Sequence, residues 1–539
     1  MNSRTSFGMR AWLVAGMCGT AIGTTVSAQI FQRAYGTQSS EIAYDIKDLY
    51  DCSYQTIGVR ALAGIPSGIH AVKYDSDGFI LWSKQYLITQ GNSAGYTLDE
   101  ARDHSLLFGC ESASGGAVAG KLIVRVTPAG IPIWGTLTQG TPFANSISAA
   151  AGTLGVSVRE ITNQRVASVN RQTAAFGVSR AGILTVQTGA GALVFERGYI
   201  PPGATPAELD FAEIREARFP TTSTDLLIVG NIFDVTAGKY GAFAMRTDPA
   251  GNIVWAREYL HPLNGISITA DGFALDGSGD IIFSGRRGPA VPGQLSPSNL
   301  IVAKLDSLTG APAWARDVDG FTNGYQAVTF TPDRTAVIAG RTSIGAAAIV
   351  NSASLIEFTN AGAFVKQELY GPMVPGFTTR GEAVTNWRPW GGYGMAGYTD
   401  DFGSGGNDIY FVKTYTDFIS GCREVKFTPL NQPVVLQVKT PALQIAQLDN
   451  WLTVNVPSND VPLNTKEACF RKRCVGDLNG DGVVDDLDFV IFAFAYDTLL
   501  CPTFPALYAC CPADFNGDGM VDDADFVLFA AAYDALLCP

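Results

Sequence analysis

The segment RTDPAGNIVWAREY, residues 246–259, is the unit from which most of the chain is built. Asp248, Pro249 and Gly251 each favour a tight turn, for separate conformational reasons. The residues from Ile253 to Tyr259 then alternate between apolar and polar, which is the period of a half-buried strand. The segment therefore predicts a turn followed by a β-strand.

The same turn and strand recur along the chain at intervals of 52 to 61 residues. The turn glycines are Gly78, Gly130, Gly191, Gly251, Gly310, Gly362 and, more weakly, Gly421. The residue four positions later is Trp82, Trp134, Phe195, Trp255 or Trp314, and it changes to Lys366 and Val425 in the last two copies. Seven copies at this period predict a mainly β fold, a seven-bladed β-propeller with four strands in each blade.

A second apolar run precedes each turn, and its terminal Gly permits a tight exit or a bulge. Examples are SLLFG at 105–109, DLLIVG at 225–230, DIIFSG at 280–285 and AVIAG at 336–340. The whole pattern resembles the Asp-x-x-Gly-x-x-x-Trp repeats of secreted bacterial β-propellers, over about residues 30–428. This resemblance implies the fold but no activity, because propellers host many functions.

The first strand of the mature chain, IFQRAY at 30–35, matches only the second half of the repeat. No Asp-x-x-Gly turn precedes it, so its first half must come from elsewhere. We expect a closed ring, in which Ile30–Tyr35 pairs with strands at about 385–416 and leaves no sheet edge open. The alternative is an extra edge strand in an open stack.

Composition narrows the class of protein. Charged residues make up 16% of the 539 residues and Gly is abundant (59), which favours short strands and tight turns. The net charge of −13 argues against nucleic-acid binding, because no basic stripe is present to neutralise phosphates. Residues 475–539 contain twelve Asp and no Lys, Arg or Glu, so this tail carries almost the whole imbalance. The apolar residues between these Asp residues favour bound cations over disorder.

The N-terminus has the features of a secretory signal peptide over residues 1–28. Arg4 and Arg10 give a positive start, 11–23 is mostly apolar, and Val26-Ser27-Ala28 is a small-residue cleavage site. We therefore expect a secreted protein, extracellular or associated with the cell surface, with no transmembrane segment in the mature chain. Nine Cys residues remain after cleavage, in a compartment where disulfides persist. Because nine is odd, at least one thiol is not paired within the chain.

Residues 430–473 break the period of the propeller at 29–429. VVLQV at 434–438 and LTVNV at 452–456 alternate like strands, so we expect a small β-rich spacer. Cys422 and Cys469 bracket this segment, and we expect a disulfide between them.

Two acidic loops in the tail have the pattern of calcium-binding loops, DLNGDGVVDDLD at 477–488 and DFNGDGMVDDAD at 514–525. Oxygen-bearing residues alternate in both, and Gly stands at the sixth position for the sharp turn. Calcium takes about six to eight oxygen ligands, so each loop can surround one ion, and we expect two Ca²⁺ ions. The predicted ligands are Asp477, Asn479, Asp481, the Val483 carbonyl, Asp485 and Asp488 in the first loop, and Asp514, Asn516, Asp518, the Met520 carbonyl, Asp522 and Asp525 in the second.

A helical stretch follows each loop, at 489–500 and at 526–537. Phe489, Phe492 and Tyr496 share one face of the first helix, and Phe526, Phe529 and Tyr533 share one face of the second. We expect the two faces to pack together in a pseudo-symmetric pair. Because the carboxylates repel one another without metal, we expect calcium binding and folding to be coupled.

The tail, about 474–539, resembles a type I dockerin, a family with a duplicated calcium loop and helix and with Asp at position twelve. In that family the module docks onto a cohesin and tethers a secreted protein, often one that degrades glycans, to a scaffold. This chain departs from the family at positions ten and eleven, where dockerins often have a Ser/Thr pair and this chain has Asp486-Leu487 and Asp523-Ala524. The calcium role survives that change, whereas a cohesin of the usual kind is placed in doubt.

Five Cys residues lie in the tail: Cys474, Cys501, Cys510, Cys511 and Cys538. Two pairings remain open. The resemblance to dockerins, whose ends meet, implies Cys474–Cys538. The rival pairing joins Cys474 to Cys501 and Cys511 to Cys538. Either staple would stabilise so small a module.

The sequence assigns no catalytic residue. His70, His104 and His261 have no metal-ligand spacing, and we interpret each as an ordinary residue of a loop or blade. No Gly-x-Ser-x-Gly or His-Glu-x-x-His motif is present. Asp234, Glu382 and Asp401 lie in expected loops, where any acid is a candidate for glycoside chemistry. Trp387 and Trp390 can stack on sugar rings, although blade packing is the simpler interpretation.

These observations predict a secreted calcium-binding protein. Its dockerin-like tail would anchor a non-catalytic propeller to a scaffold or cell surface through a cohesin-like or other protein, and the propeller would bind a glycan or a protein. One alternative is a propeller enzyme, a hydrolase or lyase of polysaccharides, carried by the same tail. Another is a structural component of a surface layer or matrix.

Overall fold

The computed structural model describes the chain in the ranges 29–87, 92–113, 120–139, 156–173, 180–203, 207–217, 225–291, 294–295, 299–319, 327–330, 335–344, 350–371, 376–387, 392–421, 424–448, 451–472, 476–478, 483–498, 513–515 and 520–535. The signal peptide predicted at 1–28 lies outside them. Within these ranges the protein is mainly β, with two helices near the carboxyl end. Among the described residues, no helix is long and apolar enough to cross a membrane.

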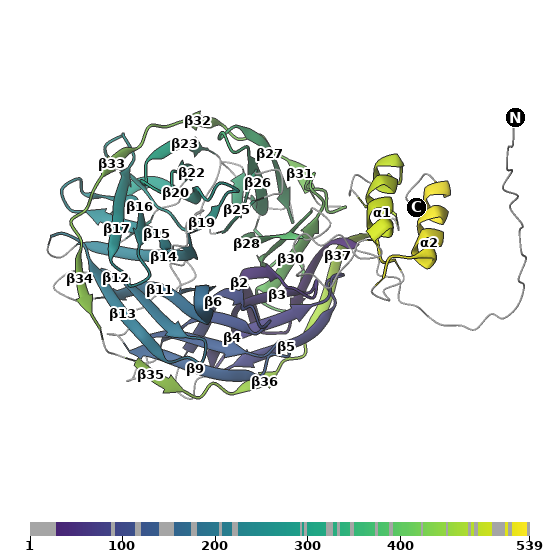
Figure 1. Ribbon diagram of the computed structural model, residues 1–539, viewed down its shortest axis with the longest axis horizontal. Helices are drawn as coiled ribbons and strands as arrows, with labels where there is room; N and C mark the ends of the chain where they lie inside the picture. The colour runs from purple at the N-terminus through teal and green to yellow at the C-terminus, as the bar shows by residue number, and fades with distance from the viewer. Residues whose placement is uncertain are drawn as a thin grey trace, which may run out of the picture.

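Antiparallel sheets stand around a central axis, so the main body is a β-propeller (Figure 1). Each repeat begins next to the axis and continues outward strand by strand. In the first repeat, β2 (Ser40–Asp48), β3 (Tyr54–Leu62), β4 (Ile65–Tyr74) and β5 (Ile80–Tyr86) pair in that order. The other innermost strands are β6 (Asn92–Glu100), β10 (Ser157–Ile161), β14 (Glu208–Glu216), β19 (Gly272–Leu275), β24 (Ala327–Phe330) and β28 (Thr379–Trp387).

The middle and outer strands complete these repeats. They are β7 (Leu106–Ala113), β8 (Gly120–Val126), β9 (Pro132–Gln139), β11 (Arg165–Thr173), β12 (Arg180–Thr188), β13 (Leu193–Ile200), β15 (Leu226–Asp234), β16 (Lys239–Thr247), β17 (Ile253–Leu260), β20 (Ile281–Val291), β22 (Asn299–Leu305), β23 (Pro312–Val318), β25 (Ala336–Ile344), β26 (Val350–Phe358), β27 (Phe364–Tyr370), β29 (Gly392–Thr399) and β30 (Asp408–Thr414). Short accessory elements are the 3-10 turn η1 (Thr162–Gln164) and the strands β18 (Ile266–Ile268) and β21 (Gln294–Leu295).

The strands form six hydrogen-bonded sheets rather than the seven separate blades that the repeat count predicts. The largest sheet has ten strands, because the runs β10–β13 and β14–β17 are joined by a single parallel pair between Arg180 and Glu208. The repeat period therefore predicted the propeller, but the pairing between neighbouring repeats differs from the expectation.

The N-terminal strand closes the ring as predicted. β1 (Gln29–Gly36) pairs antiparallel with β30, from Phe31 opposite Lys413 to Tyr35 opposite Ile409. Phe31 also packs edge-on against Phe411, with 5.0 Å between the ring centroids. The two ends of the propeller are thus held in one sheet by backbone pairing and aromatic packing.

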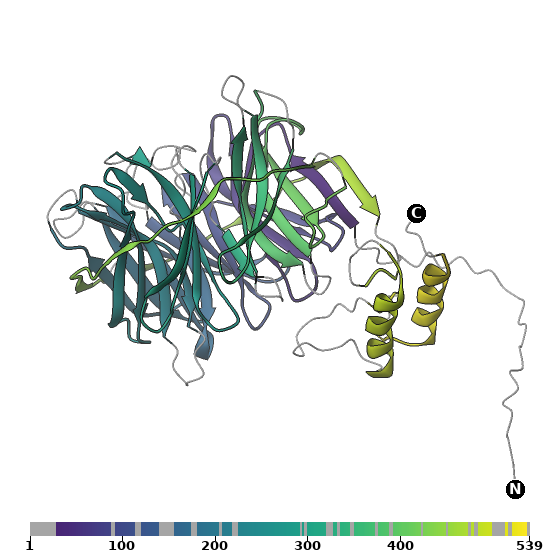
Figure 2. The same ribbon diagram turned by 90° about the horizontal axis from the view of Figure 1, so that it is seen from above.

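The expected spacer at 430–473 is not a separate unit, and that expectation is corrected here. Residues 424–472 run around the outside of the ring as a belt, and the belt adds a further outer strand to each repeat (Figures 1 and 2). The belt strands are β31 (Glu424–Lys426) on β27, β32 (Asn431–Pro433) on β23, β33 (Gln437–Lys439) on β17, β34 (Gln444–Gln447) on β13, β35 (Trp451–Val454) on β9, β36 (Ser458–Asp460) on β5 and β37 (Asn464–Lys472) on β1. The segment is rich in strands, as expected, but each strand depends on the ring for its partner.

The longest belt strand, β37, is also the most firmly held. It pairs with β1 from Gln29 opposite Lys472 to Gly36 opposite Asn464. Arg33 of β1 is almost fully buried, and its Nε donates to Glu467 of β37 over 2.9 Å. Because a buried guanidinium needs a partner, this pair fixes the register at which the belt ends.

Neighbouring repeats interlock through the Trp and Tyr of the repeated strand. Tyr259 donates to the carbonyl of Gly310 in the next turn over 2.6 Å, and Trp255 Nε1 donates to the Ser307 carbonyl over 3.2 Å. The same Tyr-to-Gly bond joins Tyr35 to Gly78, Tyr86 to Gly130 and Tyr199 to Gly251. Equivalent Trp bonds come from Trp82, Trp134 and Trp314. The repeated residues are thus structural: each strand is bonded to the following turn.

The turn glycine is required because the aromatic ring of the preceding repeat lies on it. Gly362 has a φ of +78°, which L-residues rarely adopt. A Cβ atom there would lie 2.6 Å from Cδ2 of Trp314, inside van der Waals contact. The turn that ends at Gly362 therefore provides both the chain reversal and the flat surface on which the Trp314 ring lies.

Two glycines of the second apolar run, Gly109 and Gly230, lie opposite bulges rather than at strand exits. Gly230 is in the middle of β15, and the bulge is in the adjacent inner strand, between Phe211 and Glu213. A Cβ atom on Gly230 would collide with the Asp210 carbonyl of that strand. The prediction of a bulge at these glycines was right, but the extra residue belongs to the innermost strand.

The two predicted helices are confirmed, each beginning three residues before its predicted start. They are α1 (Asp486–Thr498) and α2 (Asp523–Ala535), and both begin inside the acidic loops. The pair lies outside the ring in both views (Figures 1 and 2). Its own small core includes Phe492 and Phe529, whose rings stack with centroids 4.9 Å apart.

Candidate functional site

The first acidic loop folds around the buried carboxylate of its twelfth residue. Asp488 is fully buried, and it accepts backbone N–H groups from Leu478, at 2.6 Å, and from Asp485, at 2.9 Å. Asp477, at position one, is also buried. The two ends of the loop are therefore drawn together around carboxylate oxygens, which is the donor chemistry that calcium prefers.

The second loop makes the equivalent hydrogen bonds. Asp525 is fully buried and accepts N–H groups from Phe515, at 2.6 Å, and from Asp522, at 3.0 Å. Val483, Asp485, Asp514, Met520 and Asp522 are also among the described residues. The predicted ligands Asn479, Asp481, Asn516 and Asp518 lie outside the described residues. Within the described part of the chain, no group of three or more His, Cys, Asp or Glu side chains is arranged to hold a metal.

The two halves of the tail are clasped by a reciprocal pair of hydrogen bonds. The Tyr496 hydroxyl of α1 donates to Asp523, and the Tyr533 hydroxyl of α2 donates to Asp486. Asp486 and Asp523 are the position-ten residues at which this chain departs from the dockerin pattern. Their carboxylates therefore accept hydrogen bonds that join the two halves of the tail, a role that the sequence analysis did not predict.

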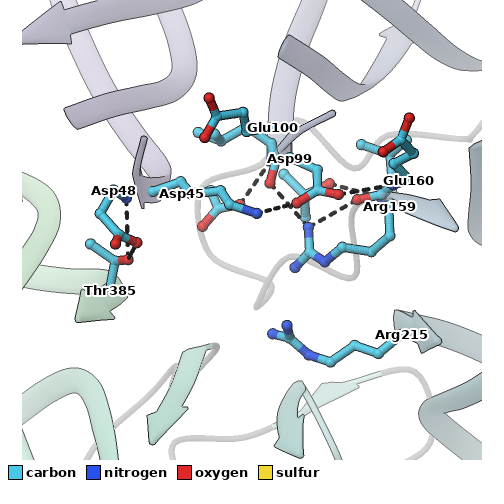
Figure 3. Close-up of polar contacts among 12 residues, drawn as sticks. Asp45, Asp48, Asp99, Glu100, Arg159, Glu160, Arg215 and Thr385 are labelled. Carbon is cyan, nitrogen blue, oxygen red and sulfur yellow. Dashed lines mark hydrogen bonds and ion pairs between the residues drawn. The ribbon is translucent and has the colours of Figure 1, made fainter. Parts of the chain in front are cut away.

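A second cluster lies around the axis of the propeller and was not predicted. It comes from four equivalent tetrads on consecutive innermost strands: 45–48 (DIKD), 97–100 (TLDE), 157–160 (SVRE) and 213–216 (EIRE). We call these four segments the axial tetrads. Figure 3 shows that side chains from several of them lie together.

The first residue of each axial tetrad bonds to the backbone of the next repeat. Asp45 accepts the N–H of Leu98 at 2.8 Å, and Glu213 accepts the N–H of Phe273 at 2.7 Å. Thr97 and Ser157 accept equivalent N–H groups, from Val158 at 3.1 Å and from Ile214 at 3.3 Å. These bonds hold neighbouring inner strands in register.

The fourth residue of the tetrads bonds in the opposite direction. Glu100 accepts the N–H of Tyr50 at 2.9 Å. In the next two repeats, Glu160 accepts from Arg102 at 2.8 Å and Glu216 accepts from Thr162 at 3.1 Å. Each inner strand is thus fastened to both of its neighbours.

The third residues are charged and form ion pairs around the axis. Lys47 pairs with Asp99. Arg159 and Arg215 both pair with Glu213, at 2.9 and 2.6 Å, and Arg215 also donates to the Phe273 carbonyl at 2.8 Å. The four tetrads together contain three cations and seven carboxylates, so these ion pairs leave an excess of negative charge.

Two of these carboxylates have pKa values that are shifted in opposite directions. Burial raises the pKa of Asp45 to about 6, although Arg159 and the Leu98 N–H oppose the shift. Burial alone would also raise the pKa of Asp99, but the charges of Lys47 and Arg159 and the Glu160 N–H lower it below its ordinary value. Burial raises the pKa of Glu100 as well. The axial tetrads thus contain one carboxyl group, that of Asp45, with a pKa of about 6, and another, that of Asp99, that stays ionised.

The sequence contained a signal for the axial tetrads. A polar residue, an aliphatic residue, a charged residue and an acid recur in that order in four consecutive repeats. The aliphatic members, Ile46, Leu98, Val158 and Ile214, are buried, so the residues on either side of them lie on the opposite face of each strand. The turn motif concealed this pattern because it is stronger and lies at the outer edge.

Of the three loop acids considered as candidates, only Asp401 lies in a loop. Glu382 is in β28 at a bulge, is almost fully buried and pairs with Arg380 at 2.6 Å. Asp234 ends β15 and pairs with Lys439 of the belt. Glu382 and Asp234 thus pair with two different cations. Trp387 ends β28, and Trp390 lies outside the described residues.

Each His is held by contacts within the propeller, as predicted. His70 is buried and bonds through Nε2 to Ser83 at 2.9 Å, and burial lowers its pKa to about 3. His104 stacks on Tyr50, and His261 bonds to Asp317 at 3.1 Å. These contacts give none of the three a metal-ligand arrangement within the described residues.

Among the described residues, the thiol of Cys110 is free, in keeping with the odd number of Cys residues. Cys110 is buried in β7, and burial raises its pKa well above the ordinary value. It is therefore an inert core residue. Cys422 and the five tail Cys residues lie outside the described residues, so the proposed pairings stay predictions.

Comparison with known proteins assigns neither a family nor an activity to the chain. No family model matches the chain, and no curated protein is similar to it in sequence. Similar solved structures include a Dyadobacter fermentans protein of unknown function, with a TM-score of 0.41, 11% identity, and coverage of 73% of this chain and 99% of that one. A Penicillium chrysogenum α-L-arabinanase has a TM-score of 0.38 and 11% identity over 60% of this chain and 93% of the other, and a Bacillus halodurans xylan β-1,4-xylosidase has a TM-score of 0.23 and 10% identity over 83% and 99%. At these TM-scores the likenesses carry no inference about activity, and the chain is established as a β-propeller only.

Proposed function

We propose that this is a secreted calcium-binding protein whose dockerin-like tail, 474–539, anchors the propeller to a scaffold or to the cell surface. Each acidic loop holds one Ca²⁺ ion, and the propeller binds a glycan or a protein without transforming it. We also propose that the ring is built of seven repeats, with β10–β13 and β14–β17 counted as two. The signal peptide at 1–28 delivers the chain outside the cell.

The observation that carries the calcium proposal is the pair of fully buried carboxylates, Asp488 and Asp525. A buried carboxylate is costly unless its charge is compensated, and a backbone N–H group carries no net charge. Residues 475–539 contain no Lys or Arg, so no cation of the tail itself can neutralise them. A divalent ion held by the alternating oxygens of each loop supplies positive charge beside these carboxylates.

Calorimetric titration of the full chain with CaCl₂ tests this proposal. We expect about two ions per chain, a rise in helical circular dichroism, and loss of one site in Asp488→Asn and of the other in Asp525→Asn. Asp497→Asn and Asp534→Asn are matched controls, because these residues are exposed in the same helices but lie outside the loops. Unchanged binding in both loop variants would reject the proposal.

The exposed surface of α1 is the best candidate for the docking face. Leu487, Val490 and Phe494 lie three and four residues apart and are each at least 60% exposed. The equivalent residues of α2 are Ala524, Val527 and Ala531, so only α1 has large side chains at all three positions. This asymmetry favours a protein partner with an apolar surface that reads one helix of the pair.

The matched variants Val490→Asp and Val527→Asp separate the two helices. Both side chains are 65% exposed, so neither change removes core packing. Surface capture from the parent cell's secreted fraction, with and without chelator, should lose its calcium-dependent component in Val490→Asp and keep it in Val527→Asp. Equal retention by both variants would remove α1 from the proposal.

A propeller enzyme that acts on polysaccharides is the second candidate. The observation that favours it is the pair Asp45 and Asp99, whose pKa values are shifted apart as in acid–base pairs. Release of reducing ends from a panel of polysaccharides, abolished in Asp45→Asn, would establish this alternative. Absence of turnover in the wild-type protein, with binding retained, supports the non-catalytic role.

A further inference from the structure

We propose that a disulfide joins the propeller to the tail, from Cys52 of the first repeat to Cys510. The inference goes beyond the anchoring role proposed above and depends on that proposal only for secretion into a compartment where disulfides persist. Cys52 lies in the turn 49–53 between β2 and β3, and its side chain is partly exposed. The bond holds the anchoring tail to the ring by a covalent link other than the main chain.

The first argument is that the thiol of Cys52 is not free. Three Cys residues lie in the described part of the chain, and only Cys110 is free among them. Cys52 and Cys469 are both disulfide-bonded. Cys52 therefore has a partner among the other Cys residues of the mature chain.

The second argument is that Cys469 faces away from the first repeat. It lies opposite Gln32 in the pairing of β37 with β1, and its Sγ atom is 4.0 Å from the Ser420 carbonyl oxygen. Arg33, the next residue of β1, points to the opposite side and bonds to the first repeat. Ser420 is two residues before Cys422, so the position of Cys469 favours the predicted disulfide between Cys422 and Cys469 and not a bond to the first repeat.

A count of the remaining Cys residues places the partner of Cys52 in the tail. The mature chain has nine Cys residues. Cys110 is free and Cys469 is assigned to Cys422, which leaves Cys52 and the five Cys residues of the tail. Five is an odd number, so disulfides within the tail must leave one residue over. That residue is the available partner for Cys52.

The duplication within the tail indicates which Cys residue is left over. Four of the five occupy equivalent positions in the two halves, and they are Cys474, Cys501, Cys511 and Cys538. Both of the pairings left open above can be completed within this set of four. Cys510 has no counterpart in the other half, so Cys510 is the residue left over.

The tail also leaves the belt near the turn that carries Cys52. β37 ends at Lys472, beside the first residue of β1. Two residues further along β1, Phe31 lies opposite Lys413, whose ammonium group is 5.5 Å from the ring centroid of Tyr54. Tyr54 directly follows the turn 49–53. The belt therefore ends at the same end of the sheets as this turn, and both views show the two helices on that side of the ring (Figures 1 and 2).

The backbone at Cys52 has a conformation that glycine adopts more easily. Its φ is +60°, and its N–H bonds to the carbonyl three residues earlier. The equivalent turn of the fifth repeat makes the same bond with Gly279, at a φ of +87°. Because the left-handed conformation is unfavourable for L-residues, the first repeat keeps a side chain where glycine would be less strained. A disulfide gives that side chain a role.

The bond forms by thiol–disulfide exchange. The thiols of Cys52 and Cys510 lose two electrons and two protons, and an S–S bond forms between their sulfur atoms. An external disulfide, carried by a thiol oxidant of the secretory compartment, accepts the electrons and protons and becomes two thiols. A thiol reductant reverses the step, so the link between ring and tail is sensitive to reduction.

Peptide mapping of the secreted full-length protein tests the proposal. The protein is denatured with its free thiols blocked and is digested with trypsin without reduction. The tail contains no Lys or Arg, so 474–539 stays one peptide, and Cys52 is in the peptide 48–60. We expect these two peptides to be joined, to separate on reduction, and to show the link at Cys510 in tandem mass spectrometry.

Thiol counting in the denatured protein gives a second test. The wild type should have one free thiol, that of Cys110. Cys52→Ser and Cys510→Ser should each have two, and the double variant should return to one. Cys110→Ser is the matched control, since it should have no free thiol and keep the link.

Several results would overturn the proposal. They are recovery of 48–60 with a blocked thiol, its link to another propeller peptide or to a second copy of itself, or its link to a tail Cys other than Cys510. The map uses the wild type, so a variant that fails to fold does not affect it. Calcium titration separates the two proposals: calcium binding without the link rejects the disulfide alone, and the link without calcium binding rejects the calcium sites alone.

Discussion

The outer edge and the axial end of each repeat are fastened by the same kind of bond, a side chain of one repeat joined to the backbone of its neighbour. At the outer edge the residues themselves are repeated: Tyr259 bonds to the Gly310 carbonyl just as Tyr35 bonds to that of Gly78. At the axis the bonds are repeated but the residues are not, since Asp45 and Ser157 serve the same purpose. Packing of a large aromatic ring on a flat glycine turn restricts the residue types at both positions. An N–H group, in contrast, is accepted equally by Asp, Thr, Ser or Glu. The axis is therefore the place where the repeats were free to diverge.

The largest effect should come from adding one carbon atom beneath an interlocking ring. Gly362→Ala places a Cβ atom 2.6 Å from Trp314, so we expect a loss of about 3 kcal/mol or more of unfolding free energy. Gly64→Ala is the matched control, because its φ of +80° is similar but nothing lies within 4 Å. The control should lose about 1 kcal/mol. Denaturant unfolding measures both, and equal losses would show that the turn conformation alone matters.

Removal of the hydroxyl group of one interlocking Tyr should lower the unfolding free energy by a smaller amount. Tyr259→Phe leaves the buried Gly310 carbonyl without its 2.6 Å partner, and we expect a loss of about 1–3 kcal/mol. Tyr54→Phe is the control, since the Tyr54 ring is equally buried and its hydroxyl has no hydrogen-bond partner among the described residues. That control should be near neutral in the same unfolding measurement. A larger loss at Tyr54 would contradict the role given to the interlock.

At the axis, we expect Asp45 to make the stability of the folded protein depend on pH. The folded-state pKa of Asp45 is raised to about 6, so the unfolded chain loses this proton first and folding is penalised as pH rises from about 4 to about 6. Asp45→Asn lacks the penalty, so its stability relative to wild type should improve by about 1–2 kcal/mol across that window, after allowance for partial exposure. Denaturant midpoints at pH 4, 5, 6 and 7 measure the difference. A stability difference that does not change with pH would show that ionisation of Asp45 does not destabilise the folded state.

The smallest effect should come from exchanging one acceptor for another. Thr97→Ser keeps the hydroxyl that accepts from Val158, and we expect a loss below about 1 kcal/mol. Thr97→Val keeps the shape but removes the acceptor, and it should cost about 1–3 kcal/mol. If Thr97→Ser were as unstable as Thr97→Val, the axial tetrads would tolerate substitution as poorly as the outer edge. The contrast drawn between the two regions would then be wrong.

Much of the ring could be predicted from the sequence, because its strongest contacts involve the rarest residue types. Trp255 and Gly251 recur at a fixed spacing, and the strand at 30–35 lacked the turn that its position in the repeat required. The helices were predictable from the periodicity of Phe492 and Tyr496. In each case the pattern is long enough to be distinguished from chance recurrence in a glycine-rich sequence.

Other features left too little pattern along the chain. The belt strands are mostly three or four residues long, which is shorter than the window in which alternation can be recognised. The clasp between Tyr496 and Asp523 joins residues from the two halves of a duplication, so it appears in neither half alone. The axial cluster depends on which strands are innermost, and only the closed ring brings residues as far apart as Lys47 and Arg215 to one wall.

The belt also sets an order of events during synthesis. Arg33 of the first strand bonds to Glu467 of the last belt strand, 434 residues later. A chain that stops anywhere before that point leaves the N-terminal strand uncovered and the outer edges bare. Truncated products should therefore be recognised by proteolytic quality control, while a cut just beyond Lys472, together with reduction of the disulfide proposed between Cys52 and Cys510, would free the tail and leave a finished ring. The cell would thus have one simple way to release the proposed anchoring tail and keep the propeller.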